Sequence, residues 1–188
     1  MEHTRKLRTW GGFLLLLVLL VTFLIWNLLA GSVRLPSSEI WAILHGGDLT
    51  QRRILLNIRL PRIVLACLVG CCLSSAGAAY QGVFQNPMAS PDVLGASSGA
   101  SFGAALAILA GGGNQGTTLS AFFWSLATVV LVYLVGQRAP GNRVLNLVLA
   151  GMVISSLFTA ATSYLKLVAD PTNQLPQITY WLMGSLSS

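Results

Sequence analysis

The stretch from Val93 to Gln137, VLGASSGASFGAALAILAGGGNQGTTLSAFFWSLATVVLVYLVGQ, decides the fold because its 45 residues contain no charged side chain. A helix needs about 20 consecutive apolar residues to cross the hydrocarbon core of a bilayer. The stretch is therefore long enough for two crossings. The segment Gly111–Gly116, GGGNQG, interrupts it with a strong turn signal. We predict two membrane spans here, at about 93–110 and 119–137.

Three further charge-free stretches occur at 9–33, 63–91 and 144–165, with lengths of 25, 29 and 22 residues. Each is long enough for one helical span. They predict spans at about 11–30, 63–84 and 145–168. The first apolar run is too long for a cleaved signal peptide. Because backbone groups in lipid must be satisfied within the segment, we predict an all-α polytopic membrane protein with about five transmembrane helices.

The composition agrees with a membrane location. Of the 188 residues, 54% are hydrophobic and 9% are charged, whereas soluble domains carry roughly 25% charged residues. The net charge of +6 does not indicate nucleic-acid binding, because the basic residues flank the spans and form no single stripe. The cysteines Cys67, Cys71 and Cys72 lie within the second span without CxxC spacing, which is typical of small packing residues rather than of a metal site.

Loop charges do not fix the orientation by themselves. Arg5, Lys6 and Arg8 favour a cytoplasmic N-terminus. Arg138 and Arg143 would then also be cytoplasmic, which gives five basic residues inside. The external first loop would also hold five basic residues, namely Arg34, Arg52, Arg53, Arg59 and Arg62. Either the topology is reversed, or these loop arginines are solvated or bind lipid phosphate, or they form a docking surface for an acidic external partner.

Two short interfacial helices are expected outside the spans. One is expected at Pro36–Leu44, where Pro36 suits a helix start. The other is expected at Gln174–Met183, after the Asp170-Pro171 turn, with Tyr180 and Trp181 at the level of the lipid headgroups.

Small residues recur at four-residue spacing in the second and third spans, which is typical of closely packed membrane helices. They are Gly70, Ser74, Ala78 and Gly82, and then Gly95, Gly99 and Gly103. We predict that Gly70, Gly95, Gly99 and Gly103 mediate helix packing.

One face of the fifth span is polar, because Ser155, Thr159, Thr162 and Ser163 recur at helical spacing. These hydroxyls either donate to backbone carbonyls and neighbouring helices or line a substrate pathway. No ionisable residue lies in the middle of any predicted span, which argues against a proton-coupled or ion-coupled carrier.

Enzyme motifs are absent from the sequence. The two lysines, Lys6 and Lys166, are not followed by Ser or Thr, which excludes a GxxxxGK[ST] phosphate-binding loop. The histidines, His3 and His45, are far apart and indicate no metal pair. We therefore expect no enzyme activity and no cofactor, and ATP-driven transport would need a separate ATPase.

Several motifs together resemble a known family. They are RLPR at Arg59–Arg62, QNPMASPDVLG at Gln85–Gly95, SGA at 98–100, LAG at 149–151 and YWLMGS at Tyr180–Ser185. Their combination resembles the FecCD-type permeases of ABC importers for iron–siderophores, haem and vitamin B12. The resemblance extends over essentially the whole chain.

The resemblance implies a multi-pass protein of the bacterial inner membrane with a cytoplasmic N-terminus. It implies a second permease subunit, two cytoplasmic ATPase subunits and an external substrate-binding protein as partners. In the vitamin B12 importer of this family, the RLPR arginines face outward and pair with glutamates of the binding protein, and the resemblance implies that docking role for Arg59 and Arg62. It also implies that span five lines the pathway. A cytoplasmic gate is expected at Asn86, Pro87, Met88, Val144 and Leu145.

The chain departs from the family in length, because family members have about twice as many spans. We therefore expect an N-terminal half or a truncated product that cannot couple ATP hydrolysis to import by itself. A non-transporting membrane protein and an ATP-independent carrier are the alternatives. An iron–siderophore is the default substrate, while haem, cobalamin and oxyanions stay open.

Overall fold

The computed structural model describes residues 2–29 and 49–185, and it is helical without strands within these ranges. Contacts divide the chain into two parts, with the boundary between Cys71 and Cys72. The short helix expected at Pro36–Leu44, together with Arg34 and His45, lies outside the described residues.

The first part contains one long helix and the start of a second. Helix α1 covers Glu2–Leu29. Helix α3 (Leu49–Ile54), the π-helix η1 (Leu55–Arg59) and helix α4 (Leu60–Phe84) follow one another without a break. The second helical segment therefore begins well before residue 63, where we expected the span to start.

A π turn precedes the proline of this continuous helix. The backbone N–H of Leu60 donates to the carbonyl of Leu55, five residues earlier. Pro61 has no N–H to offer the carbonyl of Asn57, so a regular α-helical bond is lost at this point. The chain leaves regular α geometry at Leu55 and resumes it at Leu60, directly before Pro61, as expected for a local π turn.

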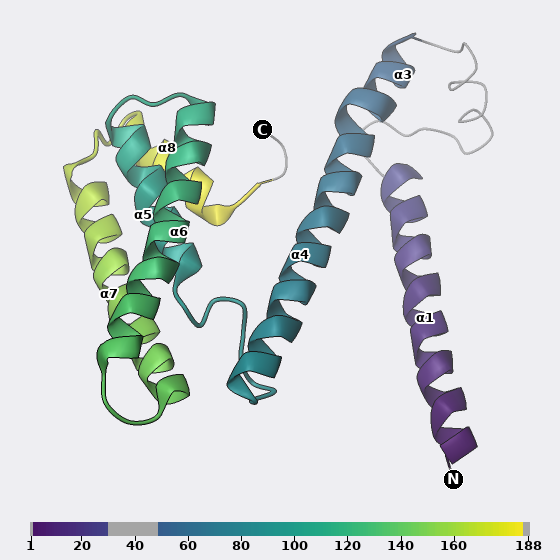
Figure 1. The fold of residues 1–188 in the computed structure, drawn as a ribbon. Helices are drawn as coiled ribbons and strands as arrows, with labels where there is room; N and C mark the ends of the chain where they lie inside the picture. The colour runs from purple at the N-terminus through teal and green to yellow at the C-terminus, as the bar shows by residue number, and fades with distance from the viewer. Residues whose placement is uncertain (1, 30–48, 186–188) are drawn as a thin grey trace. The chain divides into compact units, whose positions relative to one another are not determined.

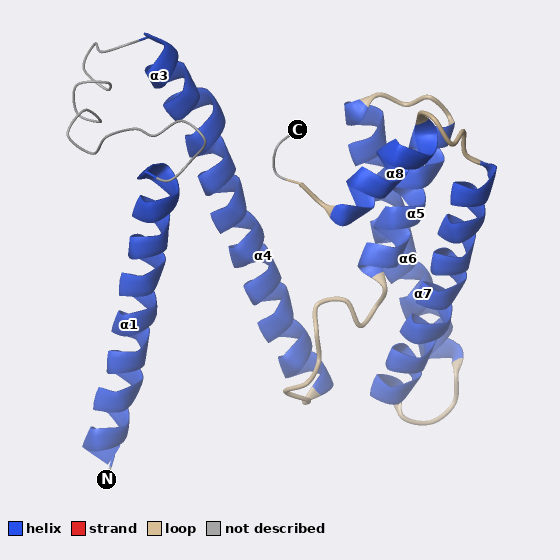
Figure 2. Ribbon diagram, turned by 180° about the vertical axis from the view of Figure 1, so that it is seen from behind, coloured by secondary structure: helices blue, strands red, loops and turns tan. Residues whose placement is uncertain are grey.

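The second part contains a helical bundle made of α5 (Ala96–Leu109), α6 (Asn114–Arg138), α7 (Arg143–Val168) and α8 (Gln174–Met183). Helix α5 packs against α6, α7 and α8, and α6 packs against α7 (Figure 1). The α6–α7 turn lies at one end of the bundle, and the α5–α6 turn lies at the other with α8 (Figure 2). The helix expected at Gln174–Met183 coincides with α8.

Helix α5 is shorter than the span expected at 93–110. Its 14 residues extend over about 21 Å at 1.5 Å per residue, compared with a hydrocarbon core of about 30 Å. It begins at Ala96 because Gly95 has a left-handed backbone with φ of 69°. Asp92 caps the new helix, since its Oδ1 atom accepts from the backbone N–H of Ser97 at 3.1 Å.

Glycines allow α5 and α6 to approach closely. A Cβ atom built at Gly99 would overlap the Thr128 hydroxyl and lie 2.7 Å from the carbonyl oxygen of Trp124. The Ser120 hydroxyl donates across the contact to the carbonyl of Gly103 at 2.7 Å. Side chains could not occupy this crossing without separating the helices.

Two apolar clusters complete the bundle. Between α5, α6 and α7, the ring centroid of Phe102 lies 4.9 Å from that of Trp124 and 5.3 Å from that of Phe158. Beneath α8, the buried residue Ile178 packs with Ala105, Ile108 and Ala169. These contacts hold α8 against α5.

Four helical stretches of the described residues are long and apolar enough to cross a membrane, and α5 is a shorter apolar helix. The four stretches are Trp10–Asn27, Arg52–Phe84, Asn114–Arg138 and Arg143–Val168.

Candidate transport sites

The predicted gate residues Asn86, Pro87 and Met88 form a hydrogen-bonded turn at the end of α4. The side-chain oxygen of Asn86 accepts from the backbone N–H of Met88 at 2.9 Å. The Gln81 amide donates to the carbonyl of Pro87 at 3.2 Å. The Met88 side chain is 86% exposed. The sequence QNPM thus forms a compact turn with a large apolar side chain on its outside.

The chain after this turn packs against α7 before α5 begins. A Cβ atom built at Gly151 would overlap the carbonyl oxygen of Val93, and one built at Gly95 would overlap the Ser155 hydroxyl. Gly151 and Ser155 lie about 12 and 18 Å along α7 from its first residue. Irregular backbone at such a depth in a membrane requires protein or water around it, and α7 provides that cover at Val93–Gly95.

Asn142 organises the turn between α6 and α7. Its side-chain oxygen accepts from the backbone N–H groups of Val144 at 2.9 Å and Leu145 at 3.3 Å. These two predicted gate residues therefore form the capped first turn of α7. The Asn146 amide donates to the carbonyl of Ala139 at 2.8 Å, which ties the turn to the helix that follows it.

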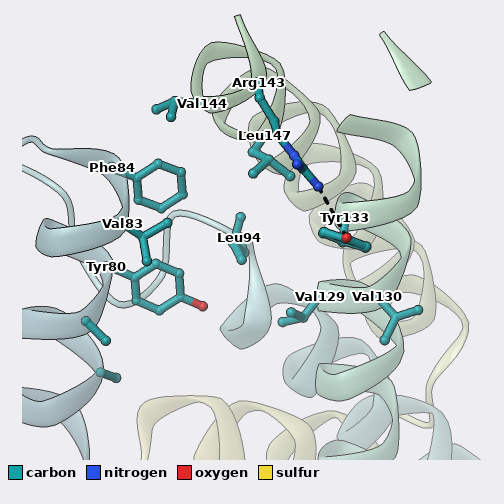
Figure 3. Close-up of a pocket in the computed structure, with 12 residues that line it drawn as sticks. Tyr80, Val83, Phe84, Leu94, Val129, Val130, Tyr133, Arg143, Val144 and Leu147 are labelled. Carbon is teal, nitrogen blue, oxygen red and sulfur yellow. Dashed lines mark hydrogen bonds between the residues drawn. The ribbon is translucent and has the colours of Figure 1, made fainter. Parts of the chain in front are cut away.

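A pocket of about 830 Å³ lies between the second half of α4 and the α6–α7 end of the bundle. Figure 3 shows Tyr80 and Phe84 on one side, with Tyr133 and Arg143 on the other. It is lined by Ala76, Ala79, Tyr80, Val83, Phe84, Leu94, Val129, Val130, Tyr133, Arg143, Val144 and Leu147. Of the five predicted gate residues, Val144 lines this pocket, and the other four do not.

Three of the four hydroxyls predicted to line a pathway donate to their own helix. Thr159 donates to the carbonyl of Ser155 at 2.8 Å, Thr162 to that of Phe158 at 2.8 Å, and Ser163 to that of Thr159 at 2.9 Å. This is the local hydrogen bonding that the sequence left open as an alternative. It satisfies the hydroxyl protons and leaves lone pairs on the oxygens.

Exposure separates these residues into two sets. Thr162 is buried and Ser155 is half-buried, next to Gly95. Thr159 and Ser163 are exposed together with Ser156. The exposed polar stripe of α7 is therefore Ser156, Thr159 and Ser163. Ser156 was missed, although its spacing of three and seven residues from the other two is a readable signal.

The arginines expected in a loop lie on a helix. Arg52 belongs to α3, Arg59 ends η1 and Arg62 is in the first turn of α4. Arg62 is exposed, as are Arg52 and Arg53, and Arg59 is half-buried. The loop assignment of these four arginines is wrong, because a charged residue does not have to end a helix.

The small residues on α4 differ from those on α5. A Cβ atom built at Gly70 meets no atom within 4 Å among the described residues. The packing role predicted for Gly70 stays a prediction. Gly99 and Gly103, by contrast, lie at the α5–α6 contact.

Asp170 shapes the turn between α7 and α8. Its carboxylate accepts from the Thr172 hydroxyl at 2.9 Å and from the backbone N–H of Asn173 at 3.0 Å. The hydrogen bond from Thr172 is the main reason that the pKa of Asp170 lies below its ordinary value. Gln174 then joins this turn to the end of α5, since its amide donates to the carbonyl of Leu109 at 3.2 Å.

Sequence comparison decides the family. The profile of the FecCD transport family matches residues 17–188. The chain belongs to this family. Membership confirms the resemblance carried by the RLPR and QNPMASPDVLG motifs. It also agrees with the all-α, multi-pass membrane fold expected from the sequence.

Relatives of this FecCD protein transport different compounds. The chain is 38% identical to the molybdate import system permease protein MolB of Haemophilus influenzae, over 75% of this chain and 42% of the relative. It is 35% identical to the hemin transport system permease protein HmuU of Yersinia pestis, over 93% of this chain and 52% of the relative. The chain therefore spans about half the length of these relatives.

A solved structure has the same fold. It is described as an inward-facing conformation of a metal-chelate type ABC transporter, and it superposes with a TM-score of 0.79 at 35% identity. The match covers 92% of this chain and 53% of that chain.

Within the described residues, no group of His, Cys, Asp and Glu is arranged to hold a metal ion.

Proposed function

We propose that this FecCD chain forms one half of the membrane pathway of an ATP-binding-cassette importer. The cargo would be a metal chelate, such as a ferric siderophore or haem, or cobalamin. The match of residues 17–188 to the family carries the proposal. The metal-chelate type transporter, matched over 92% of the chain, supports the substrate class.

The energy source would be a separate cytoplasmic ATPase subunit. The sequence has no GxxxxGK[ST] loop that could hold the phosphates of ATP. An ATP-independent carrier is less well supported, because the middle parts of the predicted spans contain no ionisable side chain for ion coupling. Removal of the ATPase subunit distinguishes the two functions. It should abolish import by an ATP-driven importer and leave import by an ATP-independent carrier unchanged.

The arginine-bearing helix would dock an external substrate-binding protein. Arg59 and Arg62 occupy the RLPR motif at the end of η1 and the start of α4. Carboxylates on a partner would pair with guanidinium groups at this surface and steer the encounter. This role places the start of α4 outside the cell and the N-terminus of α1 in the cytoplasm.

Charge reversal tests the docking role. Arg59→Glu with Arg62→Glu should abolish capture of the loaded binding protein while leaving the amount of chain in the membrane unchanged. Arg52→Glu with Arg53→Glu is the matched control, because it reverses two exposed charges on the same helical stretch outside the motif. Equal losses in both double variants would show a diffuse charge effect instead of docking.

The exposed stripe Ser156, Thr159 and Ser163 would form part of the pathway wall. Its hydroxyl protons are engaged with the helix backbone, as Thr159 and Ser163 show. The stripe therefore presents oxygen acceptors and little charge, which suits a large hydrated chelate that must not bind tightly. In the proposed permease, Thr159→Leu should slow import more than Leu157→Ala, which changes an exposed apolar residue of the same helix.

The turn Asn86–Met88 and the first turn of α7, with Val144 and Leu145, would form a gate at the cytoplasmic end. In both turns an asparagine side-chain oxygen accepts a hydrogen bond from a backbone N–H group.

A second permease subunit would complete the pathway. The localisation that follows is a bacterial inner membrane.

Import measured in cells tests the proposed function as a whole. Cells that lack their own iron-chelate permease would receive this chain with the complementary half of a related permease. Uptake of a labelled ferric chelate that stops when the ATPase is removed supports the proposal. Absence of uptake for ferric chelates, haem, cobalamin and molybdate alike would contradict it.

A further inference from the structure

The pocket between α4 and the α6–α7 end of the bundle has an apolar body and one cationic end. Its walls include Ala79, Val83 and Leu94, and its polar groups are Tyr80, Tyr133 and Arg143. Figure 3 shows Arg143 beside Tyr133, across the space from Val83 and Phe84. The transport function proposed above does not require a cavity of this composition.

Arg143 has more N–H donors than the one hydrogen bond to Tyr133 uses. A guanidinium group has five N–H donors. In the part of the chain that the structure describes, Arg143 donates to the Tyr133 hydroxyl at 3.3 Å, and its guanidinium carbon lies 6.0 Å from the centre of that ring. No carboxylate of the described residues pairs with it. The fork geometry of arginine is well matched to a phosphate group.

The length of the pocket along α4 is close to the thickness of the hydrocarbon part of one lipid leaflet. On α4 its lining runs from Phe84, the last helical residue, back to Ala76, a distance of about 12 Å. One leaflet is half of a hydrocarbon core of about 30 Å, or about 15 Å. Along α7 the lining stops at Leu147, after one turn. A docked transmembrane helix would need a groove along much more of α6 and α7.

We propose that this pocket binds an anionic phospholipid. The phosphate group would lie on the Arg143 guanidinium, and an acyl chain would lie between α4 and α6 against Val83, Leu94 and Val129. A volume of about 830 Å³ lies in the range of roughly 300–1,000 Å³ found for small-molecule sites. The inference needs only the membrane location, so it stands or falls independently of the transported compound.

Lipid titration of the purified chain tests the phosphate contact. The detergent-solubilised protein would be titrated with phosphatidylglycerol and with phosphatidylcholine, and bound lipid would be counted by native mass spectrometry. We expect preferential retention of phosphatidylglycerol. Arg143→Gln should weaken that retention about tenfold, as expected for the loss of one charge-assisted hydrogen bond. Arg138→Gln is the matched control, because Arg138 is an exposed arginine of the same turn that does not line the pocket.

A selective loss in Arg143→Gln supports the site. Unchanged retention in that variant, or an equal loss in Arg138→Gln, would overturn the proposal by showing that the headgroup does not depend on this guanidinium.

Filling the apolar body tests the acyl-chain contact. Ala79→Phe places a ring in the pocket and should reduce retention of both phosphatidylglycerol and phosphatidylcholine. Ala78→Phe is the control and should leave retention unchanged, because Ala78 is an exposed neighbour that does not line the pocket. Full lipid retention in Ala79→Phe would contradict the site. A photo-reactive residue at Val83 should add the mass of one phospholipid. An adduct to a polypeptide instead would mean that a protein segment fills the pocket, and the lipid site would be wrong.

Discussion

Substitution of Gly99 tests the close contact between α5 and α6. In Gly99→Ala, the new methyl group would lie 2.7 Å from the Trp124 carbonyl oxygen, whereas ordinary contact begins near 3.4 Å. The two helices would have to separate by about 0.7 Å at this point. Overpacking of this kind typically costs about 1–3 kcal/mol. Thr128 is fully buried against the same glycine, so the methyl group cannot avoid the carbonyl by shifting toward Thr128.

Gly116→Ala is the matched control. Gly116 is also a helical glycine near the start of its helix, but a Cβ atom there meets nothing within 4 Å. Both variants gain the preference of alanine for helices, about 1 kcal/mol, so their difference reports the steric term. For a chain of this size, 1 kcal/mol corresponds to a shift of about 2–4 °C in Tm. Thermal unfolding in detergent, followed by tryptophan fluorescence, should place Gly99→Ala clearly below Gly116→Ala. Equal Tm values would refute the close crossing.

Three further substitutions test local contacts, each by thermal unfolding. Asn142→Ala should lose about 1 kcal/mol because two N–H groups of α7 lose their cap, and Asn142→Asp should retain most of it; equal losses in both would contradict the cap. Gly95→Ala should cost at least about 1–2 kcal/mol through its left-handed backbone alone, so a second substitution, Ser155→Gly, should recover only part of the loss, and full recovery would be inconsistent with backbone strain. The lowered pKa of Asp170 means that its carboxylate supports the fold above its ordinary value of 3.8 and loses this support as the pH falls through the lowered pKa. Asp170→Asn should therefore flatten the decline in Tm below about pH 4, and an unchanged decline would assign it to other groups.

Charge spacing was sufficient to locate most of the helices. The segments expected at 119–137 and 145–168 lie within α6 and α7, and residues 11–29 of the first expected segment lie in α1. This approach works because charged side chains are costly within a bilayer, so their absence marks the helical spans. The all-helical fold class was confirmed, and so was the FecCD family.

The same signal failed where backbone conformation decides the outcome. Val93 and Leu94 are apolar and uncharged, yet they precede α5 because Gly95 is left-handed and Asp92 caps Ser97. Conversely, the arginine-rich stretch before Pro61 looked like a loop but is helical. Neither the φ angle of a glycine nor a π turn before a proline is encoded in hydropathy.

The pocket was also beyond sequence reasoning. Tyr80, Leu94, Tyr133 and Arg143 come from separate segments that no periodicity relates to one another. The glycine spacing did indicate a close contact, but it did not identify α6 as the partner of Gly99. That assignment depends on Trp124 and Thr128, whose four-residue spacing places them on one helix face but does not identify the helix they contact.

Import measured with and without the complementary half tests the central claim most directly. Cells that supply the ATPase and the binding protein would express this chain alone or together with the complementary half of a related permease. We predict ATP-dependent uptake of a labelled metal chelate by the pair, none by the chain alone, and none by the pair carrying Arg59→Glu and Arg62→Glu. ATP-dependent uptake by the chain alone would contradict its assignment as half of a pathway.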